Sequence, residues 1–346
     1  MDTAPLLFDL GKPKPTTRQI ADLVKAGGVD ALTEAKLRAD SARYQEVACR
    51  SALNSVKGMP FEWTLNPYRG CTHGCHYCYA RRYQTQFELG ADDEFASIIF
   101  VKTNFVDVLR RELEKPSWEN EYVAVGTATD CYQPIEGHYK LTRGSLEALA
   151  NASNPAGIVT KGPMIVRDID VLQELDRRAG CTVYISVPTV DEDAWEQLEP
   201  GTAHPLKRLR AVRELNEAGI RCGVLMNPIV PGITSKPSIL ERTVAAIAES
   251  GASFVGCNVM FLEGGTRDHF MRWLSDAYPH MVDGYQQLYA RKYAPTSYRK
   301  EVQNVIGLLR NKYGLNRRSE EDKIGAGTTA KAAEQRMLDW KQDRKA

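Results

Sequence analysis

The sequence predicts an α/β protein whose parallel strands and helices alternate as the units of a barrel or a part-barrel. From about residue 60 onward, short runs rich in β-branched and aromatic residues alternate with longer helical patterns, at a spacing of about 30 residues. The runs are mostly apolar, as expected for a sheet that helices cover. A chain of 346 residues is also long enough to bury a large core.

The first 55 residues are predicted to form an N-terminal helical extension. Apolar residues recur with helical spacing at 16–27 and again at 29–47. The barrel itself is expected over residues 56–265. Its candidate strands are 62–66, 97–102, 122–127, 157–161, 182–188, 222–228 and 254–261.

Helical patterns fill the gaps between most of these strands. Between 104 and 115, Phe105, Leu109 and Leu113 fall on one stripe, so this helix is predicted to pack on the sheet. Residues 266–316 are expected to form C-terminal helices packed on the barrel, and 317–346 a mobile charged tail. The other helix candidates are 142–152, 168–180, 205–220 and 238–252.

The charges of the chain are balanced: lysine and arginine number 45, aspartate and glutamate 44, for a net charge of +1. This balance gives no global attraction to nucleic acid or to an anionic membrane. Three short basic segments stand out, at 80–84, 207–213 and 298–303. The first residues lack a signal-peptide pattern, and no apolar run approaches the roughly 20 residues that cross a bilayer. We therefore expect a cytoplasmic protein with no membrane partner, whose eight cysteines stay reduced.

The most specific pattern is "CTHGCHYC", which places Cys71, Cys75 and Cys78 in a C-x3-C-x2-C motif after the first barrel strand. In βα barrels the loops after the strands form the active face. Clustered thiolates bind zinc or iron–sulfur clusters. Four thiolates usually hold a four-iron cluster, so three would leave one iron open to another ligand. The alternatives are a zinc site completed by His73 or His76, and three unconnected buried cysteines.

The motif, with Tyr77 before its last cysteine, resembles that of the radical S-adenosylmethionine (radical SAM) enzymes. Further stretches resemble the spore photoproduct lyase-like branch: "GCHYCYARR", "GTATDCYQPIEGHYKLTRG", "VTKGP", "ISVPTVDEDAWEQLEPGTAHPLKRL" and "GVLMNPIVPGI". The resemblance covers about residues 44–313. It implies a partial TIM-type (β/α)6 barrel with a four-iron, four-sulfur (4Fe-4S) cluster at its open end. Tyr77 is then expected near the adenine or the cluster loop.

The resemblance also implies a chemistry. S-adenosylmethionine (SAM) binds the open iron through its amino and carboxylate groups, and one electron cleaves its C5′–S bond. The 5′-deoxyadenosyl radical that results takes a hydrogen atom from the substrate. The implied cofactors are the 4Fe-4S cluster and SAM, and the expected electron donor is a flavodoxin- or ferredoxin-type protein. The polypeptide binds and orients these groups.

Matching positions imply the cofactor-binding residues. Thr127, Thr129 and Asp130 follow the strand at 122–127 and match the segment that meets the methionine amino group. Lys161 matches a lysine that pairs with the methionine carboxylate, and Ser186 matches a hydroxyl that contacts the ribose.

Two further parts of the pattern have a structural interpretation. Glu199 and Arg208 recur in the pattern of the group and are expected to form an ion pair. The loop at 227–232, rich in proline and glycine, is expected to help wall the adenosyl pocket.

The chain departs from the group at the hydrogen donor. Spore photoproduct lyase uses a cysteine at the end of the third strand, and the matching position here, at about Gly126 or Thr127, holds none. Cys131 instead follows Asp130, and a thiol is a good hydrogen-atom donor. Cys131 is therefore a candidate catalytic residue, and its replacement by alanine is expected to divert the product. The alternative is that Cys131 is a buried small hydrophobe. Tyr79 is a second candidate, which would pass a radical onward.

The sequence does not name the substrate. The balanced charge and the missing donor cysteine favour a nucleoside-like or other small molecule. The alternative is repair of a DNA lesion, as in spore photoproduct lyase, which requires a basic groove for the phosphates. A second alternative is a non-catalytic, cluster- or zinc-bearing protein that binds nucleic acid. No pattern indicates an oligomeric state.

Overall fold

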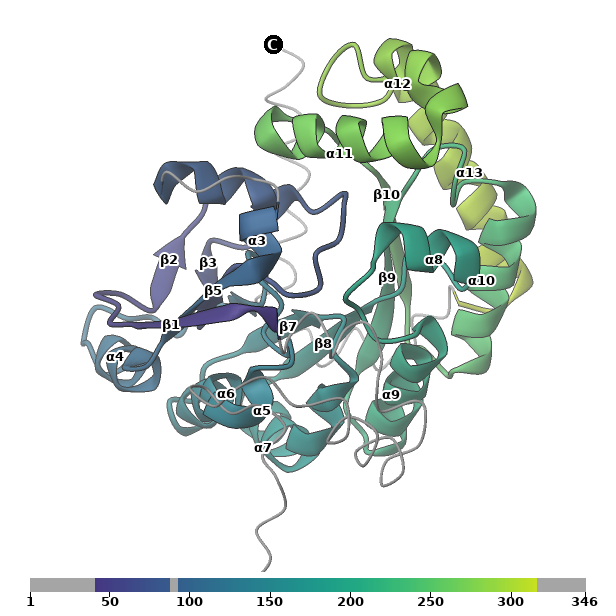
Figure 1. The fold of residues 1–346 in the computed structure, drawn as a ribbon. Helices are drawn as coiled ribbons and strands as arrows, with labels where there is room; N and C mark the ends of the chain where they lie inside the picture. The colour runs from purple at the N-terminus through teal and green to yellow at the C-terminus, as the bar shows by residue number, and fades with distance from the viewer. Residues whose placement is uncertain (1–40, 88–92, 316–346) are drawn as a thin grey trace, which may run out of the picture.

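The main feature of the fold is a seven-stranded sheet with the strand order β10-β9-β8-β7-β6-β3-β2 (Figure 1). The computed structural model describes residues 41–87 and 93–315, so the predicted tail at 317–346 lies outside them. Neighbouring strands from β3 to β10 are parallel, whereas β2 is antiparallel to β3. This arrangement is the predicted partial (β/α)6 barrel. The strands are β2 (Leu53–Ser55), β3 (Trp63–Leu65), β6 (Val123–Val125), β7 (Ala156–Thr160), β8 (Cys181–Ser186), β9 (Cys222–Ile229) and β10 (Val255–Val259).

Helices join the parallel strands and cover the outer face of the sheet (Figure 1). The predicted stripe of Phe105, Leu109 and Leu113 is buried, so the amphipathic pattern of that helix is explained by its packing. The connecting helices are α4 (Phe105–Leu113), α5 (Glu136–Tyr139), α6 (Leu141–Asn151), η3 (Pro163–Asp168), α7 (Ile169–Ala179), α8 (Glu192–Leu198), α9 (Pro205–Glu217) and α10 (Pro237–Glu249).

A small second sheet has the order β1-β5-β4 and consists of β1 (Arg43–Val47), β5 (Ile98–Lys102) and β4 (Tyr68–Arg69). The prediction that 97–102 is a barrel strand is therefore wrong. β5 is as apolar as a barrel strand, and an apolar run does not reveal which sheet it joins. The helix predicted over 29–47 is wrong at its end, because β1 pairs with β5 there.

Helices also follow β10, as predicted for this part of the chain. α11 (Gly264–Ala277) packs against η2 (Tyr79–Phe87), and α13 (Thr296–Lys312) packs against β10 and α10. The remaining short elements are α3 (Asp93–Ser97), η4 (Pro279–Met281) and α12 (Val282–Leu288). None of the helices described in 41–87 and 93–315 has the length and apolar character needed to span a bilayer.

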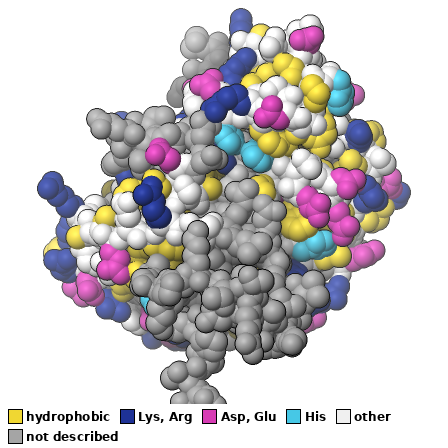
Figure 2. Space-filling view, in the orientation of Figure 1, with side chains coloured by type: hydrophobic (Ala, Val, Ile, Leu, Met, Phe, Trp, Pro, Cys, Tyr) yellow, Lys and Arg dark blue, Asp and Glu magenta, His cyan; other side chains and the backbone are white. Residues whose placement is uncertain are grey.

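The core lies between the sheet and its covering helices. Val125, Ile158, Ile185 and Val224, one from each of four neighbouring strands, have no exposed surface. On the face seen in Figure 2, basic and acidic side chains are interspersed, in agreement with the balanced net charge. Because β3 and β6 to β10 are parallel, the loops that follow them meet at one edge, and the candidate site lies there.

Candidate active site

The three cysteines of the motif lie on one loop, between β4 and η2. The backbone N–H of Cys71 donates to the carbonyl of Phe95 at 3.0 Å, and that of Cys78 donates to the carbonyl of Cys75 at 3.2 Å. None forms a disulfide; Cys71 and Cys75 are buried and Cys78 is half-buried. The thiols are close enough that charge on Cys71 raises the pKa of both Cys75 and Cys78, adding to the larger effect of burial.

A buried arginine holds this cysteine loop from inside. The side chain of Arg81 donates from Nε to the carbonyl of Cys75 at 3.0 Å and from Nη2 to the carbonyl of Gly74 at 2.6 Å. Its guanidinium carbon lies 5.0 Å from the centroid of the Phe95 ring. A guanidinium presents its donors in a fixed fork, so it can hold two successive carbonyls. This role of Arg81 could not be predicted from the sequence, where the residue stands out only as part of the basic segment 80–84.

Gln133 holds the first part of the loop. Its Oε1 accepts from the N–H of Thr72 at 3.2 Å, and its Nε2 donates to the carbonyl of Gly70 at 3.2 Å. Gly70 has a φ of +78°, and a Cβ at this position would lie 2.5 Å from the carbonyl oxygen of Ile98. Only glycine therefore fits where the loop leaves β4.

The segment after α8 closes over the opposite side of the loop. The N–H of His76 donates to the carbonyl of Leu198 at 3.1 Å, and the N–H of Gly201 donates to the carbonyl of His73 at 3.0 Å. A Cβ on Gly201 would overlap the carbonyl oxygen of Thr72. The close approach of the two backbones thus depends on a glycine in "EPGTAHP".

The three cysteines fit an iron–sulfur cluster. Burial raises the pKa of Cys75 and Cys78, so their thiolates require a nearby cation, which iron supplies. Among the described residues, no three His, Cys, Asp or Glu side chains are arranged to hold a single metal ion. In a four-iron cluster each thiolate binds a different iron, so the three sulfur atoms need not converge on one metal ion. The donor set of soft thiolates therefore favours a cluster over mononuclear zinc.

His76 has partners outside the motif, which weighs against its being a zinc ligand. His73 Nδ1 lies 3.4 Å from Asp130 Oδ2, and His73 also interacts with the thiol of Cys71. His76 Nδ1 lies 3.0 Å from His269 Nε2, and its ring stacks on Trp273 with centroids 5.0 Å apart. His76 thereby ties the cysteine loop to α11.

Lys161 is the cation that faces the cysteine loop. It follows β7 directly, its Nζ lies 3.8 Å from Glu199 Oε1, and it lies 5.7 Å from the centroid of the Tyr77 ring. Burial lowers the pKa of Lys161, but the charges of Cys75 and Glu199 outweigh this effect and raise it. The lysine is therefore held as an ammonium group beside the loop.

Glu199 and Arg208 form the expected ion pair. Arg208 Nη2 lies 2.6 Å from Glu199 Oε2, and both side chains are buried. Arg208 also donates to the carbonyl of Ser186 at 2.8 Å, and the hydroxyl of Tyr77 donates to Glu199. One buried carboxylate thus connects α9, the end of β8 and the cysteine loop.

Asp130 is held by hydrogen bonds from the ends of β6 and β7. Its carboxylate accepts from the Thr160 hydroxyl at 2.6 Å, and from the backbone N–H groups of Lys161 at 2.6 Å and Tyr132 at 2.9 Å. Burial alone would raise the pKa of Asp130, but His73 and these donors lower it to about 2. Since its oxygens have protein partners, Asp130 joins the ends of β6 and β7.

The hydroxyl of Thr129 also contacts the protein rather than an open space: it donates to the carbonyl of Gly70 at 2.6 Å and accepts from Gln133 at 3.1 Å. Thr127 lies at the same edge, with its hydroxyl beside that of Thr64 and its carbonyl accepting from the Tyr79 hydroxyl. Thr129 therefore positions the cysteine loop, while Thr127 and Tyr79 lie beside it.

Ser186 is the last residue of β8, and 5% of its surface is exposed. Its carbonyl is used by Arg208, and no hydrogen bond of its hydroxyl is found among the described residues. The hydroxyl is thus available to a ligand at the carboxyl edge, near Lys161 on the neighbouring strand.

Cys131, the candidate hydrogen donor, is buried. Its side chain has no exposed surface and belongs to the main hydrophobic core. The thiol donates to the carbonyl of Val159 at 3.7 Å, between β6 and β7. The alternative interpretation, a buried small hydrophobe, fits this geometry.

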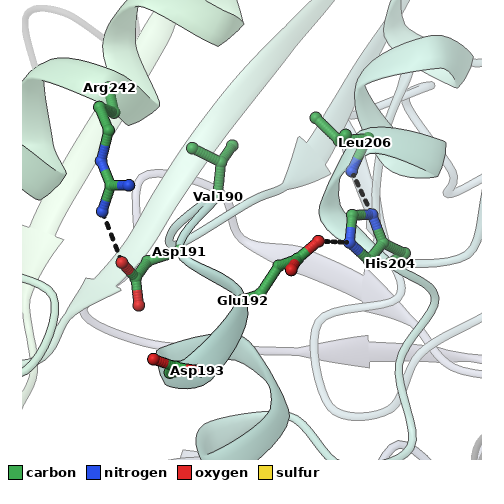
Figure 3. A pocket seen from close by; sticks show the side chains of 7 residues that line it. All are labelled: Val190, Asp191, Glu192, Asp193, His204, Leu206 and Arg242. Carbon is green, nitrogen blue, oxygen red and sulfur yellow. Dashed lines mark hydrogen bonds and ion pairs between the residues drawn. The ribbon is translucent and has the colours of Figure 1, made fainter.

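A pocket lies elsewhere, at the outer side of the helices that follow β8 (Figure 3). Its charged groups pair with one another: Arg242 with Asp191 at 2.5 Å, and His204 with Glu192 at 3.1 Å. None of the predicted site residues lines it. Its lining residues are Val190, Asp191, Glu192, Asp193, His204, Leu206 and Arg242.

Comparison with known proteins supports the interpretation of the cysteine loop. A family model described as the radical SAM superfamily matches residues 65–242, which include the loop, Lys161 and Ser186. The chain belongs to the radical SAM superfamily. Its cofactors are accordingly a 4Fe-4S cluster and SAM.

Curated relatives of this radical SAM protein are found in bacteria, archaea and phages. The uncharacterized protein Rv2578c of Mycobacterium tuberculosis (strain ATCC 25618 / H37Rv) is 38% identical over 280 residues, which span 80% of this chain and 82% of that protein. The uncharacterized protein MJ0683 of Methanocaldococcus jannaschii is 25% identical over 198 residues, 57% of this chain and 72% of that protein. The radical SAM Nalpha-GlyT isomerase of Pseudomonas phage M6 is 27% identical over 206 residues, 58% of this chain and 39% of that protein.

Among solved structures, the fold resembles that of spore photoproduct lyase. The structure complexed with dinucleoside spore photoproduct superposes with a TM-score of 0.62 and 16% sequence identity, over 82% of this chain and 83% of that chain. A mutant with bound AdoMet gives a TM-score of 0.61 at 15% identity. This similarity confirms the partial-barrel fold.

Proposed function

We propose that this radical SAM protein is an enzyme that takes a hydrogen atom from a nucleoside-like or other small-molecule substrate. The observation that carries the proposal is the meeting of the cysteine loop, Lys161 and Ser186 at one edge of the barrel. The cysteine loop supplies soft thiolate ligands, and Lys161 supplies an ammonium group. Ser186 supplies a hydroxyl that has no hydrogen-bond partner among the described residues.

When bound, the cluster supplies the electron that splits the C5′–S bond of SAM into methionine and a 5′-deoxyadenosyl radical, which takes the hydrogen atom. Cys71, Cys75 and Cys78 would hold three of the irons. Lys161 would pair with the methionine carboxylate, Ser186 would contact the ribose, and Tyr77 would lie near the adenine or the cluster. The electron would come from a flavodoxin- or ferredoxin-type protein.

The remaining predicted residues act on the shape of the site. Asp130 and Thr129 have protein partners and would position the loop and the end of β7, not meet the amino group themselves. The carbonyl and hydroxyl of Thr127 lie at the edge where that group would bind. Tyr79 borders the same region and is retained as a candidate for contact with the substrate.

The name of one similar structure supports a nucleoside-like substrate: spore photoproduct lyase, whose fold is similar, was solved with a dinucleoside spore photoproduct. The same name supports repair of a DNA lesion as the alternative function. A non-catalytic protein would have no use for the ammonium and hydroxyl groups beside the cysteine loop.

Reductive cleavage of SAM tests the proposal. Protein reconstituted with iron and sulfide without oxygen, then reduced with dithionite, is expected to release 5′-deoxyadenosine. Candidate nucleosides labelled with deuterium would be added, and transfer of the label into 5′-deoxyadenosine identifies the substrate. A fully loaded protein that forms no 5′-deoxyadenosine would contradict the proposal.

A further inference from the structure

Two of the basic segments noted in the sequence, 80–84 and 298–303, are joined in the structure through the chain that follows β10. Glu263 pairs with Arg82 at 2.8 Å and with Lys292 at 2.7 Å. Arg299 lies over the ring of Tyr293, with its guanidinium carbon 5.5 Å from the centroid. Segments that are more than 200 residues apart in the sequence thus form one surface.

Four aromatic rings form a row across this surface. Tyr79 lies 6.4 Å from Tyr83 and 6.2 Å from Phe261, between ring centroids, and Phe261 lies 5.7 Å from Tyr293. The order of the rings is Tyr83, Tyr79, Phe261 and Tyr293, and Tyr79 directly follows Cys78, so the row reaches the cysteine loop at its second ring. We call these four rings the aromatic row.

Cations lie over the rings of the aromatic row. Arg82 lies 4.9 Å from the ring centroid of Tyr83. Lys292 lies 5.3 Å from that of Phe261 and 5.4 Å from that of Tyr293. Arg299 is a third cation, beside Tyr293. Glu263 pairs with two of the three, Arg82 and Lys292.

The row leads from the site toward solvent. Tyr293, at its outer end, keeps 46% of its surface exposed and is the one aromatic residue among the described large hydrophobic side chains that are exposed. Its backbone is fixed by a bridge to Phe261, and the carbonyl of Lys292 accepts from the N–H of Leu262 at 2.9 Å. The exposed ring is therefore held in place by its backbone.

We propose that the aromatic row binds a single nucleic-acid strand, so that the nucleoside-like substrate is presented within a chain of nucleotides. Proteins that hold single strands combine cations for phosphates with aromatic rings on which bases stack. A base would stack on Tyr293, and Lys292 and Arg299 would contact its phosphates. The inference rests on the proposed function, because it places the reacting nucleoside beside Tyr79, where the row reaches the cysteine loop.

The chain contains a matched control for this surface. Lys312 pairs with Glu241 at 2.5 Å and lies 5.4 Å from the ring centroid of Tyr313. This group of a lysine, a glutamate and a tyrosine resembles the group of Lys292, Glu263 and Tyr293. It lies at the end of α13, outside the aromatic row.

Binding is measured by fluorescence anisotropy on the cluster-loaded protein with SAM and without reductant. The probe is fluorescein-labelled oligothymidylate of eight nucleotides, with thymidine and thymidine 5′-monophosphate as competitors. Tyr293→Ala is expected to weaken binding by about tenfold and Tyr293→Phe to preserve it, because stacking needs the ring. Lys292→Ala should reduce the slope of log K against log salt by about 0.7, the value for one phosphate contact. Tyr313→Ala and Lys312→Ala should match the parent.

The inference is overturned if the parent does not bind the oligonucleotide, or if the control variants weaken binding as much as those of the aromatic row. It is also overturned if the monophosphate binds as tightly as the oligonucleotide. Formation of 5′-deoxyadenosine without substrate is measured on the same preparations. If the protein cleaves SAM but does not bind the oligonucleotide, this inference is refuted and the proposed function is not.

Discussion

Lys161 lies at the end of β7 with its ammonium group between a thiol and a carboxylate. Replacement by alanine is expected to leave the fold intact, because Arg208 still neutralises Glu199. The variant lacks the ammonium group that would pair with the methionine carboxylate at this half-buried position. SAM binding should therefore weaken by about 2 kcal/mol or more. Equilibrium dialysis with labelled SAM measures this.

The control for this variant is Lys312→Ala, which removes an exposed lysine far along α13. Both variants should take up the same amount of iron as the parent. An unchanged dissociation constant for SAM in Lys161→Ala would remove this residue from the cofactor site.

Cys131 illustrates how a residue next to a functional one can face away from it. Because its thiol is fully buried, Cys131→Ala is expected to keep SAM cleavage and the distribution of products. Removal of the sulfur atom should lower the free energy of unfolding by about 1 kcal/mol. Product analysis by mass spectrometry, together with the thermal midpoint, checks both points. A new product or an adduct in this variant would restore the hydrogen-donor hypothesis.

The ligand cysteines could be identified from sequence spacing, but the residues that position them could not. Arg81 and Gln133 contact backbone carbonyls and N–H groups of the loop, and such contacts leave no pattern of residue types. Asp130 was recognised by resemblance, yet its four neighbours come from three separate segments. Which oxygen of a side chain remains free depends on the folded chain.

At the scale of elements, the conformation of the cysteine loop depends on two hydrogen bonds from the buried guanidinium of Arg81. Arg81→Lys keeps the charge but cannot hold the carbonyls of Gly74 and Cys75 together. One buried carbonyl loses its partner, at a cost of about 1–3 kcal/mol. We expect less iron and sulfide per chain after reconstitution, and a lower thermal midpoint.

Arg82→Lys is the matched control, since its side chain is half-buried and pairs with Glu263 outside the loop. This variant should load iron like the parent. Equal iron and sulfide contents in Arg81→Lys and the parent would show that the loop forms without the paired hydrogen bonds of Arg81.

The barrel strands could be predicted because each is a run rich in β-branched residues, and a stretch with helical periodicity follows it in the sequence. The predicted 122–127, 157–161, 182–188 and 222–228 correspond to β6, β7, β8 and β9 within a few residues. β5 has the same composition but joins the small sheet, and β1 is mostly polar and exposed. Pairing between distant segments decides both cases, and hydrophobic periodicity does not report it.

At the scale of the whole molecule, burial of Lys102 makes stability depend on pH. Burial lowers its pKa to about 8, with a smaller contribution from the charge of Arg69. The unfolded chain keeps the proton up to about pH 10. Between these values the folded state binds fewer protons, so stability rises as the pH rises, and it is lost as the pH falls through 8.

Lys102→Met is therefore expected to stabilise the protein at pH 7 by about 2 kcal/mol, less the hydrogen bond from Lys102 to the carbonyl of Asn66 at 2.6 Å. The gain should shrink as the pH approaches 10. Thermal midpoints of the loaded protein, measured at several pH values without oxygen, check this. The exposed Lys312 should give no such gain, and a pH-independent difference for Lys102→Met would contradict the assignment.

The parallel order of the sheet is what brings the site together: the ends of β7 and β8 and the loop after β4 meet at one edge. The central claim is that three cysteines hold a 4Fe-4S cluster there and leave one iron for SAM. The most direct test is the electron paramagnetic resonance spectrum of the reduced protein before and after SAM is added. We expect the signal of a reduced four-iron cluster that changes when SAM binds, and its loss in Cys75→Ala. A cluster signal unaffected by SAM, or stoichiometric zinc without sulfide, would contradict this account.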